Sequence, residues 1–271
     1  MQASVIAQEL LAARARSRQV PPYSESVADF DVAMAYDVAA EVLKLRKAKG
    51  EQVVGRKIGF TNANIWPEYG VDAPIWGYVY DSTLRQARDN FGVQSLKGAT
   101  QPKIEPEIAF RLRAVPKPGM SEEQLADCIE WVAHAYEVVH SAYQDWKFQG
   151  ADTIAAFGMH GVLILGTPRY VRSAGGLNRD LVKELKSFQV SLFCDGVLRE
   201  AGGGANVLGS PLLALRHLVE VLATLPQHKP LREGEIISTG TLTAAWPVKA
   251  GETWHTAFTG IDLPGLTVRF A

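Results

Sequence analysis

The stretch IEPEIAFRL, residues 104–112, places two carboxylates inside an otherwise apolar run. Its apolar residues are typical of a β-strand that enters a core. Glu105 and Glu107 are two residues apart, so both side chains project from the same face of an extended chain. Pro106 between them points to the other face and has no N–H for a sheet ladder. The sequence therefore predicts a strand at the edge of a sheet, or a strand end, that carries a pair of carboxylates.

Two carboxylates this close repel each other unless they lie in solvent, share a proton or bind a cation. On spacing alone, a solvated acidic edge strand and a metal site are both open. Glu137 lies in a second apolar context, YEVV at 136–139, where an unpaired carboxylate would be costly to bury. Three glutamates with no nearby cysteine or His-x-x-x-His pair suit Mg²⁺ or Mn²⁺ better than zinc.

Helices and strands alternate irregularly around this stretch. The patterns predict helices capped by Ser4 and ending near Gln19, and from about Ala28 to Lys49 with Gly50 after it. Strands are predicted over the ranges 53–60 and 77–81. A helix capped by Ser121, with an apolar stripe reaching Val132, precedes a strand that begins near His134.

The second half of the chain is mainly β in pattern. A buried strand is predicted over 161–166, and Asp195-Gly196 between two apolar runs predicts a hairpin over 190–198. A glycine-rich loop, 202–209, leads into a helix over 211–225 that starts with a proline. The fold class expected is α+β with a mixed, mainly antiparallel sheet.

Composition excludes several function classes. The 271 residues are 47% hydrophobic and 21% charged, with a net charge of −1, so neither nucleic acid nor an anionic membrane is an expected partner. No apolar run approaches the ~20 residues of a membrane span, and the N-terminus does not resemble a signal peptide. Cys128 and Cys194 are expected to be reduced, buried thiols of a cytoplasmic protein.

Six blocks in order resemble the hydratase/decarboxylase branch of the fumarylacetoacetate hydrolase superfamily. The likeness extends from about Ala28 to Phe270. The blocks are GRKIGFT (55–61), PIWGYVYD (74–81), KIEPEIAF (103–110), YEVVHSAYQDW (136–146), ADTIA (151–155) and NVLGSPL (206–212).

The resemblance implies a fold, a metal and a reaction class. It implies a smaller helical N-terminal region (1–70), a catalytic, mainly β domain (71–271) with peripheral helices, and assembly into dimers or higher homo-oligomers. It also implies one Mg²⁺ or Mn²⁺ bound by glutamates, and a small 2-oxo acid as substrate. The residues that match the family's site are Glu105, Glu107 and Glu137 for the metal, and Lys57 and Asp81 for catalysis.

Several of these residues have an ordinary interpretation as well. Lys57 could be a strand lysine that extends to solvent, and Asp81 a turn residue. His160 and Thr241 are candidate substrate contacts, although a hydrogen-bonded structural role is the favoured interpretation of His160. Residues 156–160 (AFGMH) depart from the family's polar Asp-Asn-Ala-Ser-like run, which predicts a more apolar pocket with Phe157 in it.

The leading functional prediction is a lyase that hydrates a 2-hydroxypenta-2,4-dienoate-like compound in the breakdown of aromatic or related compounds. The alternatives on the same metal platform are a 2-oxo acid decarboxylase, such as one for 2-oxo-3-hexenedioate, and an acylpyruvate hydrolase. A hydrolase would need a His–Glu pair to activate water, and no such glutamate is evident near His160 in sequence. A metabolite-binding protein without catalysis is the remaining class.

Overall fold

A computed structural model describes residues 1–63, 66–173, 176–177 and 180–271. The stretch with the two carboxylates forms β5 (Lys103–Leu112), an interior strand of a nine-stranded mixed sheet. Its main path runs β2-β1-β13-β5-β6-β7-β3, with β14 added beside β5 and β8 beside β6. The sheet's other strands are β1 (Val53–Gly59), β2 (Ile75–Tyr80), β3 (Leu84–Gln86), β6 (Ile129–Val139), β7 (His160–Leu165), β8 (Arg169–Tyr170), β13 (Ile236–Thr241) and β14 (Trp246–Pro247).

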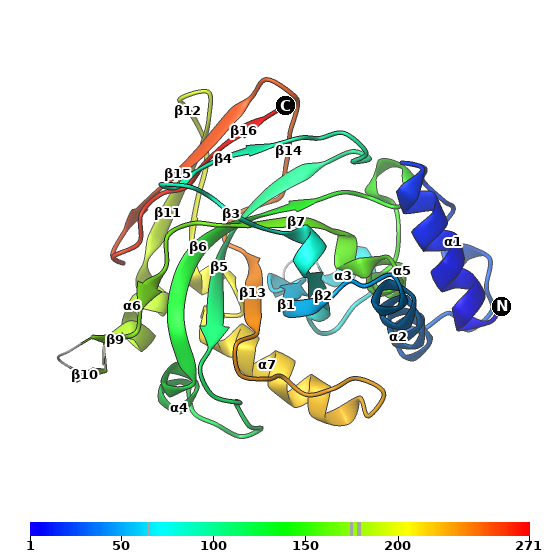
Figure 1. The fold of residues 1–271 in the computed structure, drawn as a ribbon, viewed down its shortest axis with the longest axis horizontal. Helices are drawn as coiled ribbons and strands as arrows, with labels where there is room; N and C mark the ends of the chain where they lie inside the picture. The colour runs from blue at the N-terminus through cyan, green and yellow to red at the C-terminus, as the bar shows by residue number, and fades with distance from the viewer. Residues whose placement is uncertain (64–65, 174–175, 178–179) are drawn as a thin grey trace.

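A second sheet of five strands lies at the opposite end of the molecule from the N-terminal helices (Figure 1). Its order is β12-β11-β15-β16-β4. The predicted hairpin is confirmed there, since β11 pairs with β12 through a turn at Asp195 and Gly196, both with positive φ. The strands are β4 (Phe91–Gln94), β11 (Gln189–Cys194), β12 (Val197–Gly203), β15 (Thr253–Thr259) and β16 (Thr267–Phe270), and a separate short pair is β9 (Arg172–Ser173) with β10 (Gly176–Leu177).

Helices lie around the sheets (Figure 1). They are α1 (Ala3–Ala15), α2 (Val32–Ala48), α3 (Trp66–Tyr69), α4 (Glu122–Asp127), α5 (Gly150–Ala155), α6 (Leu181–Ser187) and α7 (Pro211–Thr224). Short 3₁₀ turns are η1 (Tyr23–Glu25), η3 (Asp81–Thr83), η4 (Gln144–Trp146), η5 (Phe157–Met159) and η6 (Gly204–Asn206). The α+β class and the mainly antiparallel sheet are confirmed, because the parallel pairs are β1 with β13, β3 with β7 and β4 with β16.

The prediction that Pro106 marks an edge or a strand end is wrong. β5 is paired on both sides, with β6 and with β13. The Pro106 carbonyl accepts from the Leu242 N–H, and N and C=O of one residue point to the same side of an extended strand. The missing N–H therefore faces Leu242, just past the end of β13, whose carbonyl accepts from the Gly203 N–H and from Asn206 Nδ2. An interior strand tolerates proline here because no carbonyl of the neighbouring strand needs a hydrogen bond from this position.

Three helix boundaries differ from the predictions. Helix α1 starts before Ser4, which therefore lies inside the helix and does not cap it. Helix α2 starts at Val32 because the Asp31 side chain accepts from the Met34 N–H and caps it. Helix α4 is capped by Ser121 as predicted but ends at Asp127, and Ile129 already belongs to β6. The long pairing of β6 with β5 overrides the helical spacing of its apolar residues.

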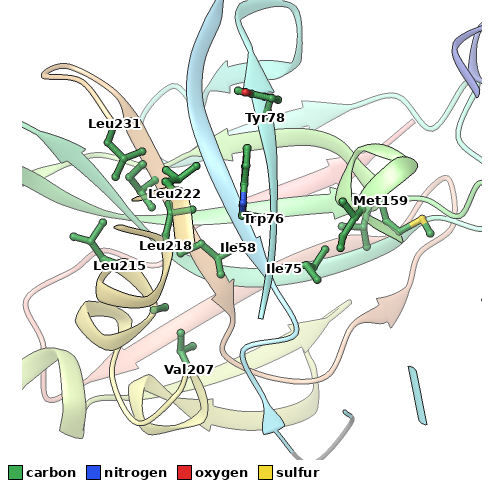
Figure 2. Packing of buried hydrophobic residues seen from close by; sticks show 14 of the residues in the cluster. Ile58, Ile75, Trp76, Tyr78, Met159, Val207, Leu215, Leu218, Leu222 and Leu231 are labelled. Atoms are coloured by element: carbon green, nitrogen blue, oxygen red, sulfur yellow. The ribbon is translucent and has the colours of Figure 1, made fainter. Parts of the chain in front are cut away.

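Helix α7 supports the strands that carry the site. Figure 2 shows Leu215, Leu218 and Leu222 of α7 on the side of the β-strand that carries Ile58, within the main core. Residues 204–224 have the length and mean hydropathy, 1.4, of a candidate membrane span, contrary to the expectation from sequence. Half of the most apolar window is buried in the protein, which is what a core helix shows.

The two cysteines are buried and free, as predicted. The division into regions 1–70 and 71–271 stays a prediction. Strand β1 falls in the first of these regions, yet it pairs with β2 and β13 of the large sheet. The purely helical layer is thus formed by α1 and α2, which contact each other at the N-terminal end of the molecule (Figure 1).

Candidate metal centre

The fold brings the three predicted glutamates together. Glu105 and Glu107 project from one face of β5, and Glu105 lies directly opposite Glu137 in the β5–β6 ladder. One carboxylate oxygen from each lies within 4.8 Å of the others. Glu107 and Glu137 are fully buried, and Glu105 is partly exposed. The solvated acidic edge is therefore ruled out as an account of this pair.

Burial makes the charged forms of two of these carboxyls unfavourable. It raises the pKa of Glu105 to about 7, although Lys57 acts in the opposite direction. Burial, followed by repulsion from Glu137 and Glu105, raises the pKa of Glu107 well above its usual value. The pKa of Glu137 is lowered, since Lys57 and His160 together outweigh its burial. A divalent cation would relieve the repulsion in this cluster.

Glu107 is held by β13 and presents one oxygen that has no partner. Its Oε2 accepts from Ser238 Oγ at 2.5 Å and from the Gly240 N–H at 3.0 Å. Its Oε1 is buried without a hydrogen bond, which is uncommon for a carboxylate in a protein interior. An orphaned, buried oxygen beside two other carboxylates fits a hard divalent ion, because such ions take carboxylate oxygens as ligands.

We expect Gly240→Ala to weaken both stability and metal binding. Gly240 has a φ of +104°, and a Cβ there would lie 2.2 Å from Thr61 Oγ1. Relieving this clash moves the Gly240 N–H away from Glu107. The expected cost is about 1–3 kcal/mol of unfolding free energy together with a weaker metal-dependent rise in Tm. Gly251→Ala, at a positive φ with open space around it, is the matched control for the backbone strain, and an equal metal response in both variants would contradict the expectation.

Lys57 lies beside the three glutamates and does not extend to solvent. Its side chain is 4% exposed, and its Nζ is 3.2 Å from Glu137 Oε2. Burial lowers its pKa, but Glu137, Glu105 and Glu107 more than offset this and leave the pKa raised. Lys57 is therefore a cation, and it also donates to the Gly158 carbonyl at 3.0 Å.

A left-handed turn supplies that carbonyl. Phe157, Gly158 and Met159 all have positive φ, of 64°, 62° and 59°, a conformation that bulky residues rarely adopt. The Arg14 guanidinium lies over the Phe157 ring at 5.0 Å and donates to the His160 carbonyl at 2.7 Å. The turn directs Phe157 toward α1, so the prediction that Phe157 makes the pocket apolar is wrong.

His160 supports Glu137 and is not a substrate contact in this structure. It is 1% exposed, and its Nδ1 donates to Glu137 Oε1 at 2.7 Å while its Nε2 lies 2.9 Å from Thr83 Oγ1. Burial lowers its pKa, despite Glu137. The expectation that His160 has no glutamate nearby is also wrong, since strand pairing places Glu137 next to it. Both ring nitrogens are occupied, so the pair is not arranged to activate a water.

Asp81 is not brought to this cluster. It is exposed in η3, and its Oδ1 accepts from the backbone N–H groups of Gln52 and Ser82. In the β1–β2 ladder, Gly77 is the residue opposite Lys57, and Asp81 lies four residues further along. The turn interpretation fits this geometry, and the proposed catalytic role of Asp81 does not.

A cavity of about 370 Å³ opens onto the site. Glu105 and Lys57 line it, as does Thr241, the predicted substrate contact, which pairs with Glu107 across β13 and β5. Its remaining polar lining is mostly neutral, and includes Asn206 from the glycine-rich loop. In Figure 2, Ile75 and Met159, which also line the cavity, lie near each other.

Sequence reasoning missed Ser238 and Thr83, the partners of Glu107 and His160. A serine in the β13 pattern and a threonine in a turn give no local signal of this role. Their function depends on which strand lies next to them.

Three interior carboxylates beside a buried, cationic lysine, on a two-sheet fold, form a candidate site for a divalent ion. Residues 62–267 match the model of the fumarylacetoacetate (FAA) hydrolase C-terminal family, so this protein is a member of the FAA hydrolase family.

The similarity to individual relatives extends over nearly the whole chain. A 2-hydroxyhexa-2,4-dienoate hydratase of Comamonas testosteroni is 30% identical over 94% of this chain and 92% of its own. A 2-keto-4-pentenoate hydratase of Paraburkholderia xenovorans is 31% identical over 94% and 90%. The structure of 4-oxalocrotonate decarboxylase from Pseudomonas putida G7, complexed with magnesium and adipate, has a TM-score of 0.88 and 27% identity, and the match covers 99% of this chain and 97% of that one.

Proposed function

We propose that this protein is a divalent-metal-dependent hydratase that adds water to a 2-hydroxypenta-2,4-dienoate-like 2-oxo acid. The observation that carries the proposal is the cluster of three carboxylates within 4.8 Å, next to a cationic lysine and open to a cavity. The relatives named as hydratases of 2-hydroxyhexa-2,4-dienoate and of 2-keto-4-pentenoate support the reaction, and we also propose a role for this chain in breaking down aromatic or related compounds.

Glu105, Glu107 and Glu137 are the residues that would hold the ion. We propose Mg²⁺ or Mn²⁺, and a relative crystallised with magnesium supports a divalent ion in general. When bound, such an ion supplies Lewis acidity toward the oxygens of a 2-oxo acid.

The protein's own groups supply charge and protons. Three carboxylates outweigh one divalent ion by one negative charge, so Lys57 is needed to make the site attractive to an anionic substrate. Lys57 lines the cavity, with its Nζ between Glu137 and the Gly158 carbonyl, and from this position we propose that it gives or takes a proton near C3 or C5 of the dienoate. Thr241 is proposed as a hydroxyl contact to the substrate.

The alternatives differ in what the cavity must provide. A decarboxylase for a dicarboxylic 2-oxo acid needs net positive charge for the second carboxylate, and the charged lining residues beyond the metal site, Lys103 and Glu200, have opposite signs. A hydrolase needs a free His–Glu pair, and His160 is buried with both nitrogens engaged. These two observations favour hydration.

The test is a substrate panel analysed by mass spectrometry. The Mg²⁺-loaded protein is incubated with 2-hydroxydienoates, a dicarboxylic 2-oxo acid and acylpyruvates. Gain of the mass of one water supports the proposal, whereas loss of CO₂ or cleavage into two fragments supports one of the alternatives. No change in any substrate, with no rise in Tm on adding Mg²⁺ and oxalate, would favour a metabolite-binding role.

We expect the affinity for Mg²⁺ to fall as the pH is lowered from about 8 to about 6. The pKa of Glu105 is about 7 and that of Glu107 is well above its usual value, so protons occupy these ligands at the lower pH. The ion must displace them, and each displaced proton weakens binding by about tenfold per pH unit. Calorimetric titrations in two buffers of different ionisation enthalpy measure the protons released, and an affinity independent of pH would contradict the expectation.

The proposed partner is a small-molecule 2-oxo acid. Assembly into a homo-oligomer and a cytoplasmic location are proposed on the family resemblance.

A further inference from the structure

One wall of the cavity is built from four aromatic side chains. The ring centroids of Phe60 and Tyr69 are 5.0 Å apart, those of Tyr69 and Phe148 are 5.2 Å apart, and those of Phe148 and Trp146 are 6.1 Å apart. All four residues line the cavity that also contains Lys57. We call Phe60, Tyr69, Trp146 and Phe148 the aromatic wall.

The aromatic wall is attached directly to the strands of the metal centre. Phe60 follows β1, which carries Lys57, and its φ of +55° is one that a bulky residue rarely adopts. The Trp66 indole N–H donates to the Phe60 carbonyl at 2.7 Å and holds this conformation. Trp146 and Phe148 follow β6, which carries Glu137. Two segments that are distant in sequence thus converge on one apolar surface within reach of the carboxylates.

The cavity has more room than a five-carbon acid needs. Its volume of about 370 Å³ falls in the range of roughly 300–1,000 Å³ that is typical of sites for drug-sized ligands. Val139, Ile75 and Met159 add aliphatic surface to the aromatic wall.

The charges near the aromatic wall do not favour a second carboxylate. Among the described residues, the charged side chains that line the cavity are Lys57, Glu105, Lys103 and Glu200. Lys57 and Glu105 belong to the metal centre. The Lys103 ammonium lies 4.1 Å from the Trp146 ring centroid, and Glu200 is fixed by the Trp246 indole N–H at 2.6 Å. One positive and one negative group leave no net charge to bind an anion there.

We propose that the aromatic wall binds an apolar substituent, alkyl or aryl, on the terminal carbon of the dienoate, and that such substituted dienoates are the preferred substrates. This inference rests on the proposed hydratase function and adds the class of substrate to it. Burial of an apolar group against aromatic rings supplies the selectivity.

The first test is a substrate series with terminal hydrogen, methyl, ethyl, butyl and phenyl groups on 2-hydroxypenta-2,4-dienoate. We expect kcat/KM to rise by about two- to fourfold for each of the first added carbons, and the dicarboxylic 2-hydroxyhexa-2,4-dienedioate to be poorer than the ethyl compound. If the unsubstituted dienoate or the dicarboxylate has the highest kcat/KM, the inference is wrong although the hydratase function stands.

Substitutions in the aromatic wall test whether this surface causes the preference for apolar substituents. Phe60→Leu, Tyr69→Leu and Phe148→Leu keep an apolar side chain but remove the ring, so each is expected to lower the butyl-to-hydrogen ratio of kcat/KM by at least about threefold. Phe91→Leu on β4, where the ring is 48% exposed, is the matched control and should leave the ratio unchanged. Equal ratios in the wall variants and in the control would overturn the assignment of this surface.

A binding measurement tests the aromatic wall independently of whether the proposed hydration occurs. Saturated 2-oxopentanoate, 2-oxohexanoate and 2-oxooctanoate cannot be hydrated, and calorimetry with the Mg²⁺-loaded protein gives their Kd values. Tighter binding with chain length, lost in Phe148→Leu, supports the aromatic wall even if no dienoate is hydrated, in which case the proposed reaction alone fails. Kd values that do not change with chain length, or no binding, count against the aromatic wall.

Discussion

Glu107→Gln is expected to abolish metal-dependent stabilisation and to lower kcat/KM by on the order of 10³-fold or more. The metal-free fold should survive, because a raised pKa means that Glu107 is already readily protonated, and glutamine has nearly the shape of the protonated acid. Its carbonyl can accept from Ser238 and from the Gly240 N–H, the two donors that now hold Oε2. The measurements are Tm with and without Mg²⁺, and the initial rate with a 2-hydroxydienoate.

The matched control is Glu130→Gln on the same pair of strands. Glu130 lies in β6, forms an ion pair with Arg111 at 2.9 Å and is one-third exposed, so an effect on stability of at most about 1 kcal/mol is expected. Both its activity and its response to Mg²⁺ should match the wild type. Should Glu107→Gln keep a normal rise in Tm with Mg²⁺, the assignment of Glu107 as a metal ligand is refuted.

Lys57→Met is expected to have the second largest effect, on stability as well as on rate. It removes the cation 3.2 Å from the buried Glu137 carboxylate. Breaking such a buried pair costs about 3–5 kcal/mol of unfolding free energy. Loss of a positioned proton donor or acceptor lowers kcat by about 10²–10⁴-fold.

The expected losses in Lys57→Met can be separated by adding metal. Excess Mg²⁺ supplies positive charge to Glu137, so it should recover part of the lost Tm while leaving kcat low. Lys97→Met, at an exposed lysine, is the control for loss of a surface charge. Recovery of kcat together with Tm would show that Lys57 only stabilises the fold, and the proposed proton transfer would then be discarded.

Much of the site could be predicted from local pattern and resemblance. The period of two in an extended chain puts Glu105 and Glu107 on one face whatever surrounds them, and the ordered blocks identify Glu137 and Lys57 as their companions. The hairpin at Asp195-Gly196 follows in the same way from turn chemistry. The roles of these site residues stay predictions until the variants above are measured.

Most of the errors near the site concern partners distant in sequence. Pro106 suggests an edge when its neighbours in the chain are considered alone, but it faces Leu242, whose carbonyl accepts from the Gly203 N–H and from Asn206 Nδ2. Asp81 is the last residue of a family block, and yet its Oδ1 accepts from the Gln52 and Ser82 N–H groups in an exposed turn. His160 is adjacent to the pocket segment in sequence, but β6–β7 pairing makes it the partner of Glu137.

The amino-acid sequence by itself thus determined the α+β class, the family and the shared direction of Glu105 and Glu107, because each depends on short-range periodicity or on ordered motifs. The tertiary structure alone decided that Glu137 lies opposite Glu105, that Gly240 and Ser238 hold Glu107, and that Phe157 turns away from the cavity. Strand register and burial set these features. Both arise from contacts between segments up to about half the chain apart, which no local pattern encodes.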